Sequence, residues 1–183
     1  MSYSLIWLQD VLKNAGLDVT ALPGWQTRGR GPMGSVKGVL CHHTACGRGA
    51  HGNEPSLGTV EHGRPDLAGP LAQLVLGRGG KYFVVAAGRC NHAGRGVWQG
   101  ITTGNSSFIG IEAENTGLPG DPWPSVQMDA YKHGVAAILK HIGAKPIMAA
   151  GHKEYALPHG RKDDPDFDMV AFRADVAKLM EHV

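Results

Sequence analysis

Short apolar segments that end abruptly constrain this fold more than any other feature of the sequence. Residues 36–41 read as a buried strand that enters the core, and residues 81–87 form a second apolar segment closed by a glycine. Residues 108–114 alternate apolar with small or charged side chains, which is the pattern of a strand buried on one face. These segments predict three strands of one sheet.

Helical patterns lie between and around these strands. Residues 125–142 give the clearest one, and residues 5–15 and 168–181 give shorter ones. Ser125 is expected to cap the N-terminus of the long helix, and Gly143 stands where a glycine commonly ends a helix. The apolar residues expected to share one face of the long helix are Val126, Tyr131, Val135, Ile138, Leu139 and Ile142.

Glycine and proline dominate the middle of the chain. Residues 23–38 read as an exposed connection, and residues 47–70 as loops and short turns that line a groove. Strands interleaved with helices and loops predict an α/β fold, in which helices flank a central mixed β-sheet. We expect one domain, with residues 1–35 as an N-terminal helix and extension and residues 36–183 as the core.

Composition narrows the class of protein. The chain of 183 residues is 42% hydrophobic and 19% charged, as in an ordinary globular protein. A net charge of +2 gives no electrostatic reason to expect a nucleic-acid partner. No stretch approaches the roughly 20 apolar residues that span a bilayer, so no membrane insertion is expected. The N-terminus lacks a basic segment followed by an apolar run, so no signal peptide is expected either.

The three cysteines are an odd number without a CxxC pair. This pattern predicts reduced thiols in a protein made in the cytoplasm, rather than disulfides or a cysteine-built zinc site.

Three residues far apart in the chain predict one zinc site. His42 ends the first strand, His152 follows the apolar residues 146–150, and Asp164 lies in a loop just before Pro165. Catalytic zinc takes three nitrogen, oxygen or sulfur ligands and leaves a fourth position open. Two strand-end histidines and a loop carboxylate therefore suit an open site.

Residue type alone leaves two choices open at this site. Neighbouring residues of a strand point to opposite faces, so only one of His42 and His43 can face the metal. Asp163 is the alternative to Asp164, and the position before Pro165 favours Asp164, because that residue is biased away from helix.

Five short motifs, in this order, resemble the type-2 N-acetylmuramoyl-L-alanine amidases. This family includes phage endolysins and shares its fold with the peptidoglycan recognition proteins. The resemblance covers residues 39–172, and the segment ending in Pro23-Gly24-Trp25 is similar to actinobacteriophage endolysins. The motifs are His42-His43-Thr44-Ala45, Asn91-His92-Ala93-Gly94, Phe108-Ile109-Gly110-Ile111-Glu112, Gly151-His152 and Arg161-Lys162-Asp163-Asp164-Pro165.

The resemblance implies a ligand set. His42 matches the first zinc ligand because the family motif reads His-x-Thr-Ala, and His152 matches the second. Asp164 matches the third, where many relatives have cysteine. The hydroxyl of Thr44 is expected to support a ligand from behind.

The resemblance also implies catalytic roles. Glu112 matches the general base, and its predicted burial raises a carboxyl pKa toward the working range. Lys162 matches a lysine that stabilises the tetrahedral oxyanion. His92 is expected to bind substrate or to orient a neighbouring residue. Three structural alternatives remain: Glu112 as a solvated strand residue paired with a lysine, Lys162 as a solvated lysine of a charged loop, and His92 as a structural residue.

The implied function is zinc-dependent hydrolysis of the amide between N-acetylmuramic acid and L-alanine in bacterial peptidoglycan. A phage endolysin for host lysis is the expected role, made in the host cytoplasm and acting on the wall after release, as a monomer. One alternative is a peptidoglycan-binding module of the same fold that does not cut. Another is a cysteine hydrolase with Cys41 or Cys46 as nucleophile.

Overall fold

A six-stranded mixed sheet forms the centre of the protein, as the computed structural model shows for residues 1, 3–47 and 52–182. The strand order is β1-β6-β5-β7-β2-β8, and all neighbours are parallel except β5 and β6. This confirms the expected α/β fold. The strands are β1 (Val19–Ala21), β2 (Gly38–His43), β5 (Leu74–Leu76), β6 (Tyr82–Val84), β7 (Phe108–Ala113) and β8 (Ala149–Gly151).

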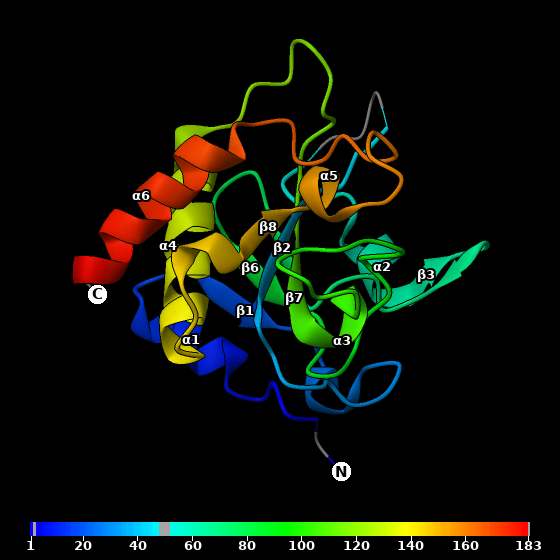
Figure 1. Cartoon of the computed structure of the whole chain (residues 1–183). Helices are drawn as coiled ribbons and strands as arrows, with labels where there is room; N and C mark the ends of the chain where they lie inside the picture. Colours follow the sequence, from blue (N-terminus) through cyan, green and yellow to red (C-terminus); the bar gives the residue numbers. More distant parts are fainter. Residues whose placement is uncertain (2, 48–51, 183) are drawn as a thin grey trace.

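The two faces of the sheet are covered differently (Figure 1). Three helices pack on one face: α1 (Leu8–Asn14), α4 (Ser125–His141) and α6 (Met169–His182). The other face carries loops and short elements. These are α2 (Leu57–His62), the hairpin of β3 (Gly63–Arg64) and β4 (Leu67–Ala68), α3 (Gly104–Ser107) and α5 (His152–Tyr155), with 3-10 turns η1 (Trp25–Thr27) and η2 (Pro146–Met148) elsewhere.

Alternation along β2 decides which side chains reach each face. Val39 and Cys41 belong to the core beneath the three helices, whereas Leu40 packs on the opposite side with Phe108 and Tyr155. His42 has the parity of Leu40, so its ring lies on the loop-covered face. The Tyr131 hydroxyl, from α4, lies 3.0 Å from both the backbone nitrogen and the carbonyl oxygen of His42 and fixes the end of the strand.

The long helix ends as predicted but begins differently. Gly143 has φ +67°, and the amides of Gly143 and Ala144 donate to the carbonyls of Lys140 and Leu139, which closes the helix in a left-handed C-terminal turn. Ser125 is the first helical residue and not the cap, because the chain enters the helix from Pro124 without a side-chain cap. Val126 is 52% exposed and does not share the buried face.

Three other predictions were incomplete. Residues 47–70, expected to be loops and turns, contain α2 and the β3–β4 hairpin among the residues that the structure describes. Residues 23–38 are not wholly exposed, because Trp25 and Met33 are buried in the main core. Strands β1 and β5 were not predicted. Over the described ranges, no helix is long and apolar enough to cross a bilayer.

Candidate metal centre and active site

The parallel register of the central strands brings the first two groups together. His42 on β2 is directly opposite Glu112 on β7, one residue from the end of each strand. On the other side of β2 lies β8, which runs straight into α5, so that His152 emerges beside the end of β2. Carboxyl ends of parallel strands meet at one edge of a sheet, and the site forms there.

The loop after α5 supplies the third group. The amide of Lys153 donates to the carbonyl of Asp164 over 2.6 Å, and the Lys153 ammonium donates to the Phe167 carbonyl over 2.7 Å. Since Lys153 follows His152 directly, these two bonds fix the distance between the second histidine and the aspartate.

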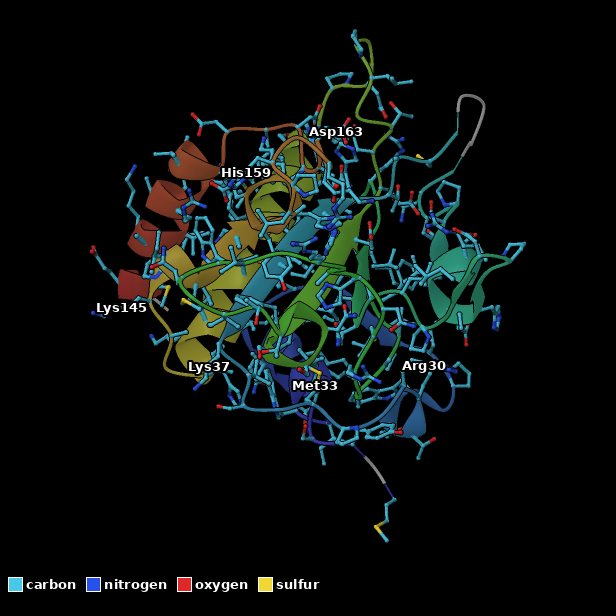
Figure 2. All side chains as sticks on the ribbon, turned by 45° about the vertical axis from the view of Figure 1, so that its right-hand side comes forward. Arg30, Met33, Lys37, Lys145, His159 and Asp163 are labelled. Atoms are coloured by element: carbon cyan, nitrogen blue, oxygen red, sulfur yellow. The ribbon has the colours of Figure 1, made fainter. Side chains whose placement is uncertain are left out.

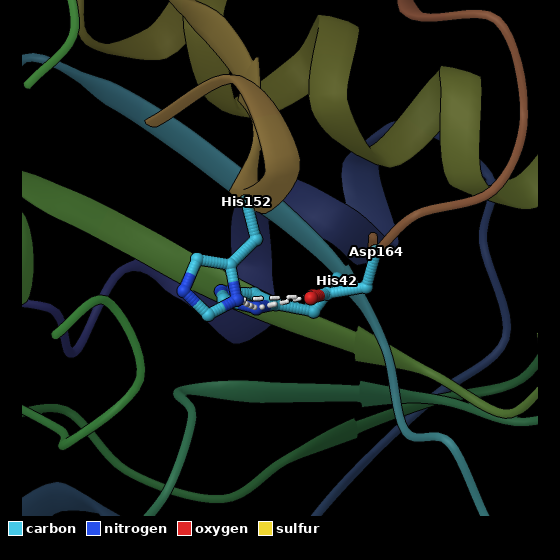
Figure 3. A group of neighbouring side chains, drawn as sticks. All are labelled: His42, His152 and Asp164. Carbon is cyan, nitrogen blue, oxygen red and sulfur yellow. Dashed lines mark hydrogen bonds and ion pairs between the residues drawn. The ribbon is translucent and has the colours of Figure 1, made fainter. Parts of the chain in front are cut away.

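His42, His152 and Asp164 converge on one point (Figure 3). The two Nδ1 atoms are 3.0 Å apart, and each lies 3.1 Å from Asp164 Oδ2. All three side chains are buried, with residue exposures of 1%, 4% and 7%. The structure therefore contains a buried His-His-Asp group from three separate segments of the chain.

This group fits a tetrahedral metal ion. Ligands bound at 2.0–2.1 Å in tetrahedral geometry lie about 3.3 Å from one another, close to the three separations observed. Burial, followed by the neighbouring His152 ring, lowers the pKa of His42 to about 4. The His42 ring is therefore neutral at pH 7 and keeps the lone pair that a metal needs.

The directions of the side chains separate His42 from His43 and Asp164 from Asp163. His43 points to the helix-covered face, where its Nδ1 lies 3.5 Å from Asp166 Oδ1 and its ring lies near Trp123. Asp163 is exposed on the loop after α5, at the same end of the molecule as His159 (Figure 2). Only His42 and Asp164 of these two pairs join the buried group.

Glu112 lies beside the group without belonging to it. Its Oε1 is 3.9 Å from His42 Nδ1, and its buried Oε2 has no hydrogen-bond partner among the described residues. Burial raises the pKa of Glu112 well above its usual value, and the nearby Asp164 carboxylate raises it further. A half-buried carboxyl that lines the cleft is suited to exchange a proton with a small molecule there.

The cleft over this group continues on both sides of it. Its centre, of about 190 Å³, is lined by His42, Glu112, His152, Lys162 and Asp164. It adjoins one hollow lined by residues of the 44–71 segment and another lined by His92, Arg161 and Lys162. Lys162 is exposed and lines both the central hollow and the hollow beside it, where a substrate can reach its side chain.

Arg64 borders all three hollows from the β3–β4 hairpin. The sequence pattern predicted only loops and turns there, so Arg64 had no expected role. The turn sequence Arg64-Pro65-Asp66 between two short segments was the available signal for a hairpin.

Two neighbouring polar groups have other partners than expected. Thr44 donates to Glu114 Oε2 over 2.9 Å and does not support a metal ligand. His92 is 8% exposed, and both of its ring nitrogens face protein atoms, His42 Nε2 and the Phe108 carbonyl.

The cysteine alternative has no support in the geometry. Cys41 is fully buried, and burial raises the pKa of its thiol to about 12, so it stays protonated at neutral pH. Cys46 lies 3.6 Å from an Arg78 nitrogen and has no imidazole recorded as a partner in the described structure. All three cysteines are free thiols.

Comparison with known families agrees with this site. The family model described as N-acetylmuramoyl-L-alanine amidase matches residues 32–167, which is more than half of the chain and includes every residue of the buried group. The chain belongs to the N-acetylmuramoyl-L-alanine amidase family. A search of curated protein sequences gave no match.

Solved amidase structures share the fold. The E. coli amidase AmiD, solved with a muramyl-peptide substrate, superimposes with a TM-score of 0.62 at 22% identity, over 81% of this chain and 60% of that one. The catalytic domain of XlyA gives 0.63 at 15% identity, over 87% and 99%. The Clostridium intestinale endolysin amidase LysCS gives 0.57 at 14%, over 87% and 95%. The chain thus spans less than two thirds of AmiD.

Proposed function

We propose that this amidase is a zinc enzyme that hydrolyses the amide between N-acetylmuramic acid and L-alanine in peptidoglycan. The observation that carries the proposal is the convergence of His42, His152 and Asp164 on one point beneath a cleft. Two imidazoles and a carboxylate form a donor set typical of catalytic zinc. The muramyl-peptide substrate bound by AmiD supports the choice of amide.

The protein groups divide the remaining chemistry. When bound, zinc polarises the amide carbonyl and lowers the pKa of water toward about 7. Glu112 accepts the proton of the attacking water and returns a proton to the departing nitrogen as the carbon–nitrogen bond breaks. Lys162 stabilises the negative charge that develops on the carbonyl oxygen, where losing one such donor costs about 2.7–4 kcal/mol.

The bond cut is tested on purified sacculi. Mass spectrometry of the digest should show stem peptides with a free amino group on L-alanine and glycan with a free lactyl carboxylate. Elemental analysis of the purified protein should show about one zinc per chain. Binding to sacculi without new termini would indicate a non-catalytic module and overturn the proposal.

A matched pair of loop variants tests the metal ligand. Asp164→Asn should lose zinc and peptide release, because its oxygen belongs to the converging group. Asp163→Asn should keep zinc, since Asp163 is exposed and outside that group. Equal zinc content in the two variants would contradict the assignment of Asp164.

We also propose that the enzyme acts as a phage endolysin, as a monomer that reaches the wall from the cytoplasm. The fold shared with the endolysin amidase LysCS supports this role. Bacteria that express the protein in the cytoplasm should stay intact until their membrane is permeabilised, and turbidity should then fall. Glu112→Gln is the control, and an unchanged culture with the unmodified protein would contradict the role.

A further inference from the structure

Both histidines of the candidate metal site contact the same short segment, residues 91–94. His152 Nε2 lies 3.0 Å from the carbonyl oxygen of Ala93, and His42 Nε2 lies 3.2 Å from Nδ1 of His92. These are the nitrogens that face away from the converging group. We propose that this segment holds both rings with Nδ1 free for the metal, and that His92 is a positioning residue for His42. The inference rests on the proposed zinc site.

The hydrogen on the His42 ring is placed by a chain of partners. His92 Nε2 lies 3.2 Å from the Phe108 carbonyl oxygen, which only accepts, so this nitrogen carries a hydrogen. The His92 ring is buried between uncharged partners, where a charge would be costly, so its Nδ1 is an acceptor. His42 Nε2 must then donate to it, and the lone pair of His42 is on Nδ1.

The same reasoning applies to the second histidine. The Ala93 carbonyl accepts from His152 Nε2, so the lone pair of His152 is also on Nδ1. Both lone pairs therefore face each other and the Asp164 carboxylate across 3.0–3.1 Å. Three electron-rich atoms held at this separation need a cation between them.

Two neighbours hold the segment in place. The side-chain oxygen of Asn105 accepts hydrogen bonds from the amides of His92 and Ala93, over 2.9 and 2.7 Å. Gly110 leaves room for the His92 ring, since a Cβ there would lie 2.8 Å from His92 Cγ. The glycine of the Phe-Ile-Gly-Ile-Glu motif thus serves the histidine of the Asn-His-Ala-Gly motif.

Zinc affinity, measured by competition with a chromophoric chelator, tests the role of His92. His92→Phe fills the space but cannot accept from His42, and we expect it to weaken zinc binding by about 10–100-fold. His92→Gln restores an acceptor and should recover most of that loss. The metal-free variants should unfold at similar temperatures, which separates positioning from folding. Equal affinity of His92→Phe and the unmodified protein would overturn the inference.

A second pair of variants covers the case in which His92→Phe does not fold. Asn105→Leu removes the acceptor for the two amides, whereas Asn105→Asp keeps it. We expect weaker zinc binding for the leucine variant and near-normal binding for the aspartate variant. Equal zinc affinity in these two variants would also overturn the inference.

Nuclear magnetic resonance gives a direct readout on the unmodified protein loaded with zinc. A ¹⁵N–¹⁵N coupling across the hydrogen bond should connect His42 Nε2 with His92 Nδ1. A spectrum in which His42 Nε2 is resolved and shows no such coupling would overturn the inference. If the unmodified protein binds no zinc, the proposed function itself fails, which is a different outcome from normal zinc binding that is insensitive to residue 92.

Discussion

Glu112 has an environment unlike that of a surface carboxylate, because its side chain is only 18% exposed. Among the described residues, its Oε2 has no hydrogen-bond partner. Burial raises the pKa of Glu112 well above its usual value, and the nearby Asp164 carboxylate raises it further. In the metal-free protein the folded state therefore retains a proton that the unfolded chain releases. Between the unfolded pKa, near 4.3, and the raised folded pKa, stability must fall as pH rises.

Replacement of Glu112 should consequently separate stability from activity. Glu112→Gln should raise the unfolding temperature of the metal-free protein at pH 7 and change it little at pH 4, because the ionised form is absent from the variant. Turnover on sacculi should fall by about 10²–10⁴-fold while zinc content stays near one per chain. Thermal unfolding in chelator at both pH values is the measurement, and a loss of stability at pH 7 would contradict the pKa assignment.

Each residue of the site was predictable from the sequence, but the direction in which its side chain points was not. Motif order indicated His42, His152 and Asp164, and the structure brings these three together. The choice of His42 over His43 depends on which face of β2 the three long helices cover. That is a property of the whole sheet, which a local pattern does not contain.

His92 is a second residue whose contacts the sequence did not reveal. Its motif suggested contact with substrate or orientation of a neighbouring residue, and contact with substrate stays a prediction. The structure gives both ring nitrogens protein partners from β2 and from the start of β7. No spacing along the sequence reveals a hydrogen bond between residues 50 positions apart.

At the scale of elements, two helical glycines should respond in opposite ways to the same change. Gly134 lies where α4 crosses the sheet, and a Cβ there would overlap the Tyr82 hydroxyl. Gly58, in α2, is exposed and has nothing near its added Cβ. Helix propensity alone favours alanine at both positions by about 0.5–1 kcal/mol.

We expect Gly58→Ala to raise the free energy of unfolding by that amount and Gly134→Ala to lower it by about 1–3 kcal/mol. Chemical denaturation of the two variants, under identical zinc conditions, measures both. Stabilisation by Gly134→Ala would mean that α4 moves away from β6 at little cost.

The sequence predicted those strands that lie in long apolar segments. The six-residue strands β2 and β7 carry a full apolar pattern and were found within two residues of their ends. β1, β5 and β6 have three residues each, and only β6 was predicted, because it lies in the longer apolar segment 81–87. β1 and β5 become strands because β6 and β7 offer paired backbone groups beside them, so tertiary context decides their state.

For the whole molecule, metal binding and folding should be coupled. The three ligands come from β2, α5 and the loop after α5, so the site exists only in the folded chain. Zinc at 100 times its dissociation constant should add about 2.7 kcal/mol to the free energy of unfolding. This corresponds to a rise of about 5–10 °C in unfolding temperature for a chain of this size.

Calorimetry with zinc and with excess chelator measures this rise. Asp164→Ala is the control, and it should show a much smaller rise because one ligand is missing. If the unfolding temperature of the unmodified protein did not depend on zinc, the three donors would not form a tight zinc site.

The N-terminal segment has a practical consequence for anyone who trims this enzyme. The family match begins at residue 32, yet β1 pairs with β6 and Leu5, Leu8 and Leu12 are buried in the main core. A fragment that starts at residue 32 would expose the edge of β6 and a hydrophobic patch beneath α4. An exposed strand edge promotes pairing with strands of other molecules. We expect this fragment to be insoluble. A longer fragment that starts at residue 3 should remain soluble during purification.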